Sequence, residues 1–292
     1  MRNVLGVSGR NLRLFFRDPL NVFFSLLGAL IIFVLYSLFL GNLQVLSITA
    51  AAPEADEHLV RGFVDAWMFG AVVALSTITT PLGALSVFVE DAATGRFRDF
   101  LVAPMRRMQL VLGYIGSAFV IGVIMTVVVF VVALLYLWLL SGVVLGPAEI
   151  ARSLLWIVLS TAGFTALWSF VVSYLPSQGS FAALSTVVGT IAGFVAGAYI
   201  AVGLFPDAVR NVVSALPFAQ SAMLLRQEFT GEALEKLMDG DQKAIDGINE
   251  FYGNTLHVGD WTVPVWVAVA TLVAVAVVFS ALAASRIRAR ID

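Results

Sequence analysis

Residues 90–107 combine charged and aromatic side chains in a pattern that could form a binding surface. Phe97, Phe100 and Leu101 are spaced i, i+3, i+4, which predicts one apolar stripe on a short helix flanked by charges. Ala103-Pro104 ends this helix, because proline disfavours a helical conformation in the residue before it. Such a helix can dock into a groove on a soluble partner or lie on the membrane surface, and its periodicity favours neither.

A second group of candidates consists of hydroxyl side chains inside long apolar stretches. They form two runs: Ser76, Thr77, Thr79 and Thr80 ahead of Pro81, and Thr161, Thr165 and Ser169 at i, i+4, i+8. These hydroxyls could line the path of a transported molecule. Small polar residues in membrane helices more often mediate helix packing, so packing is the commoner explanation.

The motifs needed for several other kinds of chemistry are missing. The chain has no Gly-x-x-x-x-Gly-Lys-Ser/Thr sequence to bind nucleotide phosphates, no Gly-x-Ser-x-Gly and no His-Glu-x-x-His. It has no cysteine, which excludes disulfides, zinc–thiolate sites and thiol catalysis. His58 and His257 lie in separate predicted loops, where a lone histidine is usually only a polar surface residue. We therefore expect a chain that is not an enzyme and that holds no metal or cofactor of its own.

The elements that must position these residues are membrane helices. Of the 292 residues, 60% are apolar and 12% are charged, and the mean hydropathy is +0.96. Soluble domains have about 25% charged residues, and a soluble core of this size could not bury so much apolar surface. The surplus must face lipid, so we predict an all-α, polytopic membrane protein.

Six stretches are apolar and long enough to cross a bilayer, which takes about 20 residues. They lie near 20–40, 63–89, 109–140, 150–174, 181–203 and 262–284. The third is interpreted as one extended helix, because no turn signal precedes Ser141-Gly142. No ionisable residue lies near the middle of any of them, which argues against a proton- or ion-coupled transporter.

The distribution of basic residues predicts the orientation. The N-terminal arm, the loop 90–108, the turn 175–180 and the tail together hold 11 of the 17 Lys and Arg residues and five acidic ones. The opposite side holds six basic and fourteen acidic residues. By the positive-inside rule the first side is cytoplasmic, so both termini are expected in the cytoplasm of a cell-membrane protein.

Two segments outside the spans have a recognisable character. Residues 2–17 predict an amphipathic helix on the inner leaflet, with Arg10, Arg13 and Arg17 on one face and Leu5, Leu12, Phe15 and Phe16 opposite. The alternative is a basic topology signal without a fixed helix. The outer segment 204–261 predicts an acidic helical cap over 231–260, preceded by an apolar stretch at 216–226 that is too short to cross and fits a re-entrant or interfacial element.

Several of these segments, in this order, resemble the permeases of type-2 ATP-binding-cassette (ABC) exporters. Glu90-Asp91, Thr94-Gly95-Arg96, 100–104 and Arg106-Arg107 resemble the cytoplasmic coupling region of that family. Arg17-Asp18-Pro19 looks like its N-terminal elbow, and 216–226 is similar to its segment after the fifth span. The longer acidic insert at 231–260 departs from the pattern and leaves the structure of the cap open.

This resemblance implies a permease subunit that dimerises and binds two cytosolic ABC ATPase subunits, which carry the ATP and Mg²⁺. No contact with nucleic acid is implied. Phe97, Phe100 and Leu101 would enter a groove of the ATPase, with Arg96, Arg98 and Asp99 as polar contacts. The implied function is ATP-driven export of an amphipathic, drug-like or lipid-linked molecule. An ATP-independent membrane channel or scaffold protein is the alternative.

Overall fold

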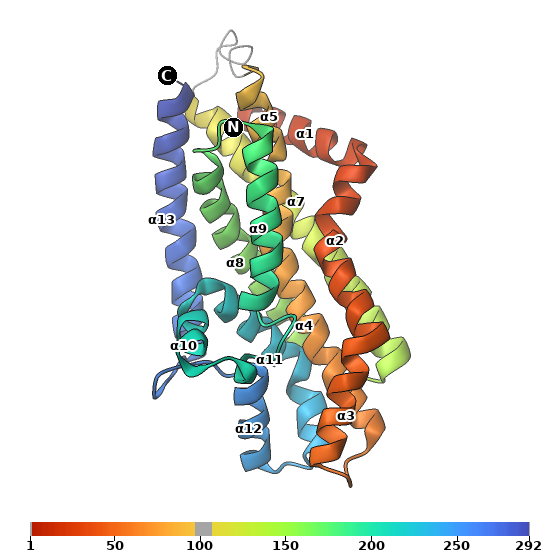
Figure 1. Ribbon diagram of the computed structural model, residues 1–292. Coiled ribbons are helices and arrows are strands. Elements are labelled where there is room, and N and C mark those ends of the chain that lie inside the picture. Colours follow the sequence, from red (N-terminus) through yellow and green to blue (C-terminus); the bar gives the residue numbers. More distant parts are fainter. Residues whose placement is uncertain (1, 97–106, 292) are drawn as a thin grey trace.

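The computed structural model describes residues 2–96 and 107–291 and consists of long helices packed side by side (Figure 1). Within these residues six helices are long and apolar enough to cross a membrane. The prediction of an all-α protein with six transmembrane helices is therefore confirmed. The strands are two short segments, β1 (His257–Val258) and β2 (Trp261–Thr262), paired antiparallel in a small hairpin.

The observed spans follow the predicted ones with shifted ends. The first is one continuous helix made of α2 (Pro19–Leu35), a π-helical turn η1 (Tyr36–Leu40) and α3 (Gly41–Ala51). The others are α4 (Glu57–Ala84) with α5 (Ser86–Ala93), α7 (Arg107–Tyr136) with the π-helical turn η2 (Leu137–Ser141), α8 (Pro147–Val172), α9 (Gln178–Val195) and α13 (Val265–Ile291). The long third stretch is thus a single helix, as predicted.

The fifth span ends earlier than the sequence suggested. We predicted 181–203, but α9 stops at Val195 and is followed by a turn in which Gly197 adopts a left-handed conformation with φ of +63°. Such a glycine commonly terminates a helix, because it lacks the Cβ that disfavours this region. The apolar residues that follow, which hydropathy assigned to the span, form this turn and the short 3₁₀ helix η3 (Val202–Leu204).

Helix α4 forms the centre of the bundle. It packs against α2, α7, α8 and α11 (Pro217–Leu237), and most of its side chains are buried, including Phe63, Trp67 and Leu75. A helix that is apolar on all sides is expected at such a position. In contrast, α2, α9 and α13 lie at the periphery and expose large apolar side chains, as lipid-facing helices do.

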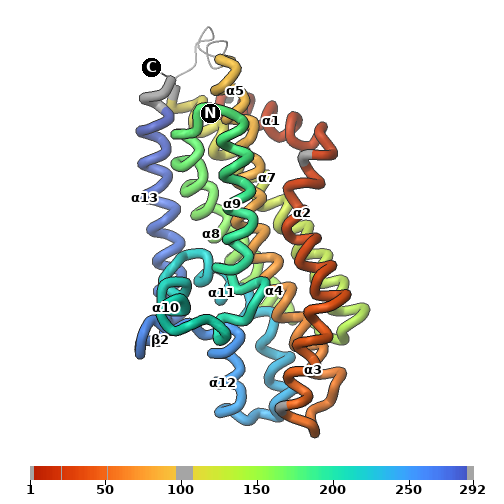
Figure 2. The backbone as a smooth tube through the Cα atoms, viewed as in Figure 1, coloured from red at the N-terminus to blue at the C-terminus, as the bar shows by residue number. Residues whose placement is uncertain are grey.

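The two ends of the bundle differ in character (Figures 1 and 2). Helix α1 (Arg2–Arg17), α5 and the C-terminal end of α13 lie at one end. The end of α3, α10 (Asp207–Ala215), α12 (Gln242–Tyr252) and the β hairpin lie at the other. The start of α1 and the end of α13 therefore share one side, as an even number of crossings requires.

The apolar stretch 216–226 begins a helix that enters the bundle rather than crossing it. Residues of α11 from Ala219 to Arg226 are buried against α4 and α8, and α10 and α11 are joined at Leu216-Pro217. Proline at the first position of α11 has no N–H to lose there, so it starts the helix without cost. This geometry agrees with the re-entrant alternative.

Candidate functional site

Helix α1 is docked on the first turns of α7 by apolar and polar contacts. Its buried face consists of Val7, Asn11 and Phe15, at i, i+4, i+8. Val7 lies against Gly113, where a Cβ atom would come within 2.7 Å of it. Asn11 donates a hydrogen bond from Nδ2 to Ser117 Oγ at 3.0 Å. The side chains of α1 therefore fit one specific surface of α7.

The predicted division of α1 into a basic and an apolar face is partly wrong. Arg13 and Arg17 are exposed, but Arg10 turns inward. On the face expected to be apolar, Phe15 is buried while Leu5 and Phe16 are exposed. The reason is that the buried face is set by the surface of α7, which accepts small and polar side chains. The sequence of α1 alone does not reveal the shape of that surface.

Asp91 on α5 is the centre of the charged cluster at this end. Its side chain is only 1% exposed and accepts hydrogen bonds from Arg10 Nη1 at 2.6 Å and Nη2 at 3.2 Å. Tyr114 Oη of α7 donates to the same carboxylate at 2.6 Å, and Arg96 Nη1 lies 3.3 Å from it. A bidentate arginine and a tyrosine are the partners that a buried carboxylate needs to remain charged.

This cluster joins three elements through one side chain. Arg10 comes from α1, Asp91 from α5 and Tyr114 from α7. The hydrogen bond to Asp91 raises the pKa of Arg10 above its ordinary value. Neighbouring Glu90 is half exposed and pairs with Arg96 at 3.1 Å, an arrangement that contributes little in water. Of the two adjacent acids, Asp91 therefore carries the structural role.

The predicted coupling region is described only in part. Thr94 caps α5 and donates its hydroxyl to Glu90 O at 2.8 Å, and Gly95 has a φ of +74°, which ends the helix. Phe97, Arg98, Asp99, Phe100 and Leu101 lie outside the described residues. Their contact with an ATPase stays a prediction, while the position of Glu90 to Arg96 beside the Asp91 cluster is a finding.

The hydroxyls predicted to line a path are enclosed between helices. Ser76, Thr77 and Thr80 are buried and donate to backbone carbonyls of their own helix at 2.6–2.9 Å. Thr161, Thr165 and Ser169 are buried on α8. A Cβ atom added at Gly122 of α7 would lie 2.8 Å from the methyl group of Thr161, so α7 and α8 pack closely at this point. This geometry favours helix packing, and their role in a path stays a prediction.

An open groove with mixed lining lies instead between α2, α4 and α9. A cavity of about 260 Å³ is lined by Phe24, Ser25, Gly28, Thr79, Leu82, Gly83, Ser86, Phe181, Ser185 and Gly189. A second cavity of about 620 Å³ shares Phe24 and Ser86 with it and extends to Asp18, Glu90, Asp91 and Gln178. Of the residues proposed from sequence for a path in α4, only Thr79 lines this groove. Ser25 of α2 and Ser185 of α9 were missed, because neither belongs to a run of hydroxyl residues longer than two.

With the elbow helix, six spans and the re-entrant segment in place, comparison with known families is informative. A family model described as ABC-2 type transporter matches residues 3–229. The chain belongs to the ABC-2 type transporter family. No curated protein matches it.

The matched range runs from the start of α1 into α11, so it contains both the Asp91 cluster and the groove of this ABC-2 protein. Membership makes the chain a transmembrane transporter subunit, and it implies association with ABC ATPase partners. The cap helix α12 and the last span α13 lie beyond the match.

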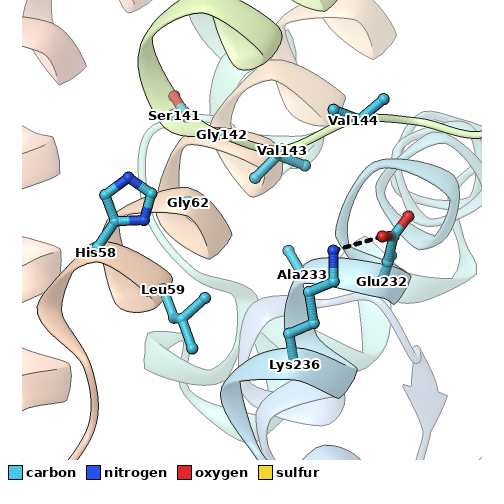
Figure 3. A pocket seen from close by; sticks show the side chains of 10 residues that line it. All are labelled: His58, Leu59, Gly62, Ser141, Gly142, Val143, Val144, Glu232, Ala233 and Lys236. Carbon is cyan, nitrogen blue, oxygen red and sulfur yellow. Dashed lines mark hydrogen bonds and ion pairs between the residues drawn. The ribbon is translucent and has the colours of Figure 1, made fainter.

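A further cavity of the ABC-2 protein, of about 40 Å³, lies at the opposite end (Figure 3). His58, Gly142 and Val143 border it on one side and Lys236 on the other, with Lys236 Nζ paired to Glu232 Oε1 at 2.6 Å. Within the described residues no group of three or more His, Asp or Glu side chains is placed to hold a metal ion. The cavity has room for only a few water molecules.

Proposed function

We propose that this ABC-2 protein is the permease subunit of an ATP-driven exporter that moves an amphipathic, drug-like or lipid-linked molecule out of the cytoplasm. Two cytosolic ATPase subunits would bind the end of the bundle that carries α1 and α5, and they would supply ATP hydrolysis with Mg²⁺. In this arrangement both termini are cytoplasmic and the protein lies in the cell membrane.

The Asp91 cluster is the observation that carries this proposal. The segment after Arg96 is the one that would contact the ATPase, and it follows α5 in the chain. Since Asp91 binds Arg10 of α1 and Tyr114 of α7, a displacement of α5 is transmitted to both helices. A coupling segment that merely lay on lipid would need no such buried connection.

The groove between α2, α4 and α9 supports the class of substrate. Phe24, Leu82 and Phe181 provide apolar contacts, while Ser25, Thr79 and Ser185 provide hydroxyls. Binding sites for amphipathic molecules combine an apolar wall with a few polar groups in this way. The groove begins at the end of the bundle that carries Glu90, where a molecule from the cytoplasm or the inner leaflet would reach it.

The exposed face of α9 supports pairing with a second permease subunit. Thr186, Thr190 and Ala182 are exposed on it, and both threonine hydroxyls donate to carbonyls of their own helix at 3.0 Å. Small and self-satisfied side chains allow close approach of a second helix in the membrane. Because α9 borders the groove, a second subunit there would cover it.

Co-purification with the ATPase tests the proposal. We expect Phe97→Asp with Phe100→Asp to abolish recovery of the ATPase on the tagged permease, because two charges would enter an apolar groove. A matched control is Phe251→Asp, which changes an exposed phenylalanine on α12, at the opposite end of the bundle. Retention of the ATPase by the first variant would overturn the coupling assignment. Solute movement by the reconstituted permease alone, without ATP, would support the channel alternative.

A further inference from the structure

Arg226 of α11 is a charged residue enclosed by protein. It is 1% exposed and ranks among the largest fully buried side chains. Among the described residues no carboxylate pairs with its guanidinium group. Burial of a charge without a counter-ion is strongly unfavourable, so its retention in a membrane protein indicates a specific task.

The partners of Arg226 are backbone carbonyls at the ends of two helices. Its Nη2 donates to Ala196 O at 2.7 Å and to Gly197 O at 2.6 Å, directly after α9. Its Nη1 donates to the carbonyl oxygen of Tyr252 at 3.4 Å, and Tyr252 is the last residue of α12. Carbonyls at helix C-termini lack intrahelical partners and carry partial negative charge. The guanidinium therefore binds two helix ends together.

Glycines on three sides make room for this arrangement. Gly197 and Gly253 have φ of +63° and +72°, and a Cβ atom on either would lie 3.1–3.2 Å from guanidinium nitrogens. On α4, a Cβ atom on Gly70 would come within 3.0 Å of the Arg226 Cα. The backbone is thus shaped around Arg226 on α4 and at the ends of α9 and α12.

Aromatic side chains connect this site to the first two spans. The Arg226 Cζ lies 5.2 Å from the centroid of the Trp67 ring, and Trp67 Nε1 donates to Tyr252 O at 2.8 Å. Tyr36 stacks edge-on against Trp67 and donates to Tyr199 O at 3.5 Å. The cluster of Tyr36, Trp67, Tyr199, Arg226 and Tyr252, here called the Arg226 cluster, therefore holds η1 of the first span, α4, α11 and α12 to the end of α9.

The Arg226 cluster lies beyond the end of the groove that faces away from α5. The groove is lined by Gly28 of α2, Thr79 of α4 and Gly189 of α9. On each helix the cluster residue lies farther from α5 than the groove residue does: Tyr36 in η1 lies beyond Gly28, Trp67 on α4 beyond Thr79, and Ala196 after α9 beyond Gly189. A molecule in the groove could leave on that side only after α9 separates from α2 and α4.

We propose that Arg226 is the latch of an outer gate. In the structure its hydrogen bonds to Ala196 and Gly197 hold the end of α9 against the bundle and close the groove toward the outside. Release of substrate requires these two carbonyls to leave the guanidinium, which stays attached to α12 through Tyr252. This inference rests on the proposed function, because it assigns the groove as the path.

The absence of cysteine from the chain makes the gate directly measurable. Ser185→Cys places one thiol in the groove with little change in size. Intact cells that express this chain together with its ATPase are used, and ATP hydrolysis is not stimulated. A membrane-impermeant maleimide is then added outside the cells. We expect little labelling of Ser185→Cys alone and several-fold more when Arg226→Met is added, because α9 is no longer held.

Arg210→Met is the matched control. Arg210 lies on neighbouring α10 and pairs with exposed Asp207 at 2.7 Å, so its loss should leave labelling unchanged. Inside-out vesicles should label Ser185→Cys in all variants, which shows that the thiol is reactive. Equal labelling from outside in the Arg226→Met and Arg210→Met variants would overturn the latch.

A second variant keeps the test decisive where Arg226→Met fails to fold. Gly197→Ala keeps the buried charge and pushes a methyl group toward the guanidinium, so we expect increased labelling from outside, smaller than for Arg226→Met. Unchanged labelling in a folded Gly197→Ala protein would also contradict the latch. Recovery of the ATPase on each variant is measured separately, so loss of the partner, which concerns the proposed function, is distinguished from failure of the gate.

Discussion

The Asp91 cluster and the Arg226 cluster are two solutions to the burial of a charge, one at each end of the bundle. Asp91 is held by the side chains of Arg10, Arg96 and Tyr114, and Arg10 still reaches solvent with 31% of its side chain exposed. Arg226 is fully enclosed and held by backbone carbonyls. Flexible side chains can follow a carboxylate as α5 moves, whereas carbonyls are fixed to their helix ends.

This difference indicates two mechanical roles. Contacts through long side chains keep α1, α5 and α7 together over a range of positions, as a transmitting element requires. Contacts through backbone carbonyls are either made or lost when a helix end moves, as a gate requires. The predictions below test this distinction through the free energy of unfolding in detergent, from the largest expected effect to the smallest.

Arg226→Lys should have the largest effect, lowering the free energy of unfolding by about 3 kcal/mol. Lysine keeps the buried charge but lacks the planar fork that reaches carbonyls on two helices. The control is Arg210→Lys, whose exposed pair with Asp207 should leave stability within about 0.5 kcal/mol of the parent. Equal losses in the two variants would show that Arg226 is not specially held.

Asp91→Ala should cost somewhat less, about 2 kcal/mol, because the freed Arg10 can turn to solvent. Glu90→Ala, at the adjacent position, should change stability by no more than about 0.5 kcal/mol, since its pair with Arg96 is half exposed. A double-mutant cycle with Arg10→Met measures the coupling directly. A coupling energy near zero would remove Asp91 as the link between α1 and α5.

Alanine at two glycines with positive φ separates backbone strain from contact with Arg226. Gly95→Ala should cost about 1 kcal/mol from its left-handed conformation alone, because no atom of the described residues lies within 4 Å of the new methyl group. Gly197→Ala should cost about 2 kcal/mol, since the same strain is joined by contact with Val202 and with the guanidinium of Arg226. Equal effects would mean that both Val202 and the guanidinium move away freely.

Two tyrosine substitutions compare a single hydroxyl contact at each cluster. Tyr114→Phe removes a 2.6 Å hydrogen bond to the Asp91 carboxylate and should cost about 1.5 kcal/mol. Tyr36→Phe removes a 3.5 Å contact to Tyr199 O and should cost less than about 0.5 kcal/mol. A larger loss for Tyr36→Phe would assign the hold on α9 to this hydroxyl as well as to Arg226.

Some of the groove was accessible to sequence reasoning and some was not. The run from Ser76 to Thr80 indicated a polar region on α4, but only the packing of α2 and α9 decides that Thr79 faces the groove and that Thr80 does not. Ser25 was overlooked because it stands alone in an apolar stretch, and Ser185 because it has only Thr186 directly beside it. Helical periodicity defines the faces of a helix, but it does not tell which face a neighbour covers.

The sequence by itself determined the number of membrane helices, the common side of the two ends and several helix boundaries. These follow from hydrophobic length and from local effects of proline and glycine, which act within a few residues. Only the tertiary structure decided that Arg10 pairs with Asp91, 81 residues away, and that Arg226 is buried. The partners of Arg226 are backbone carbonyls, which every residue carries, so no residue type in the sequence could reveal them.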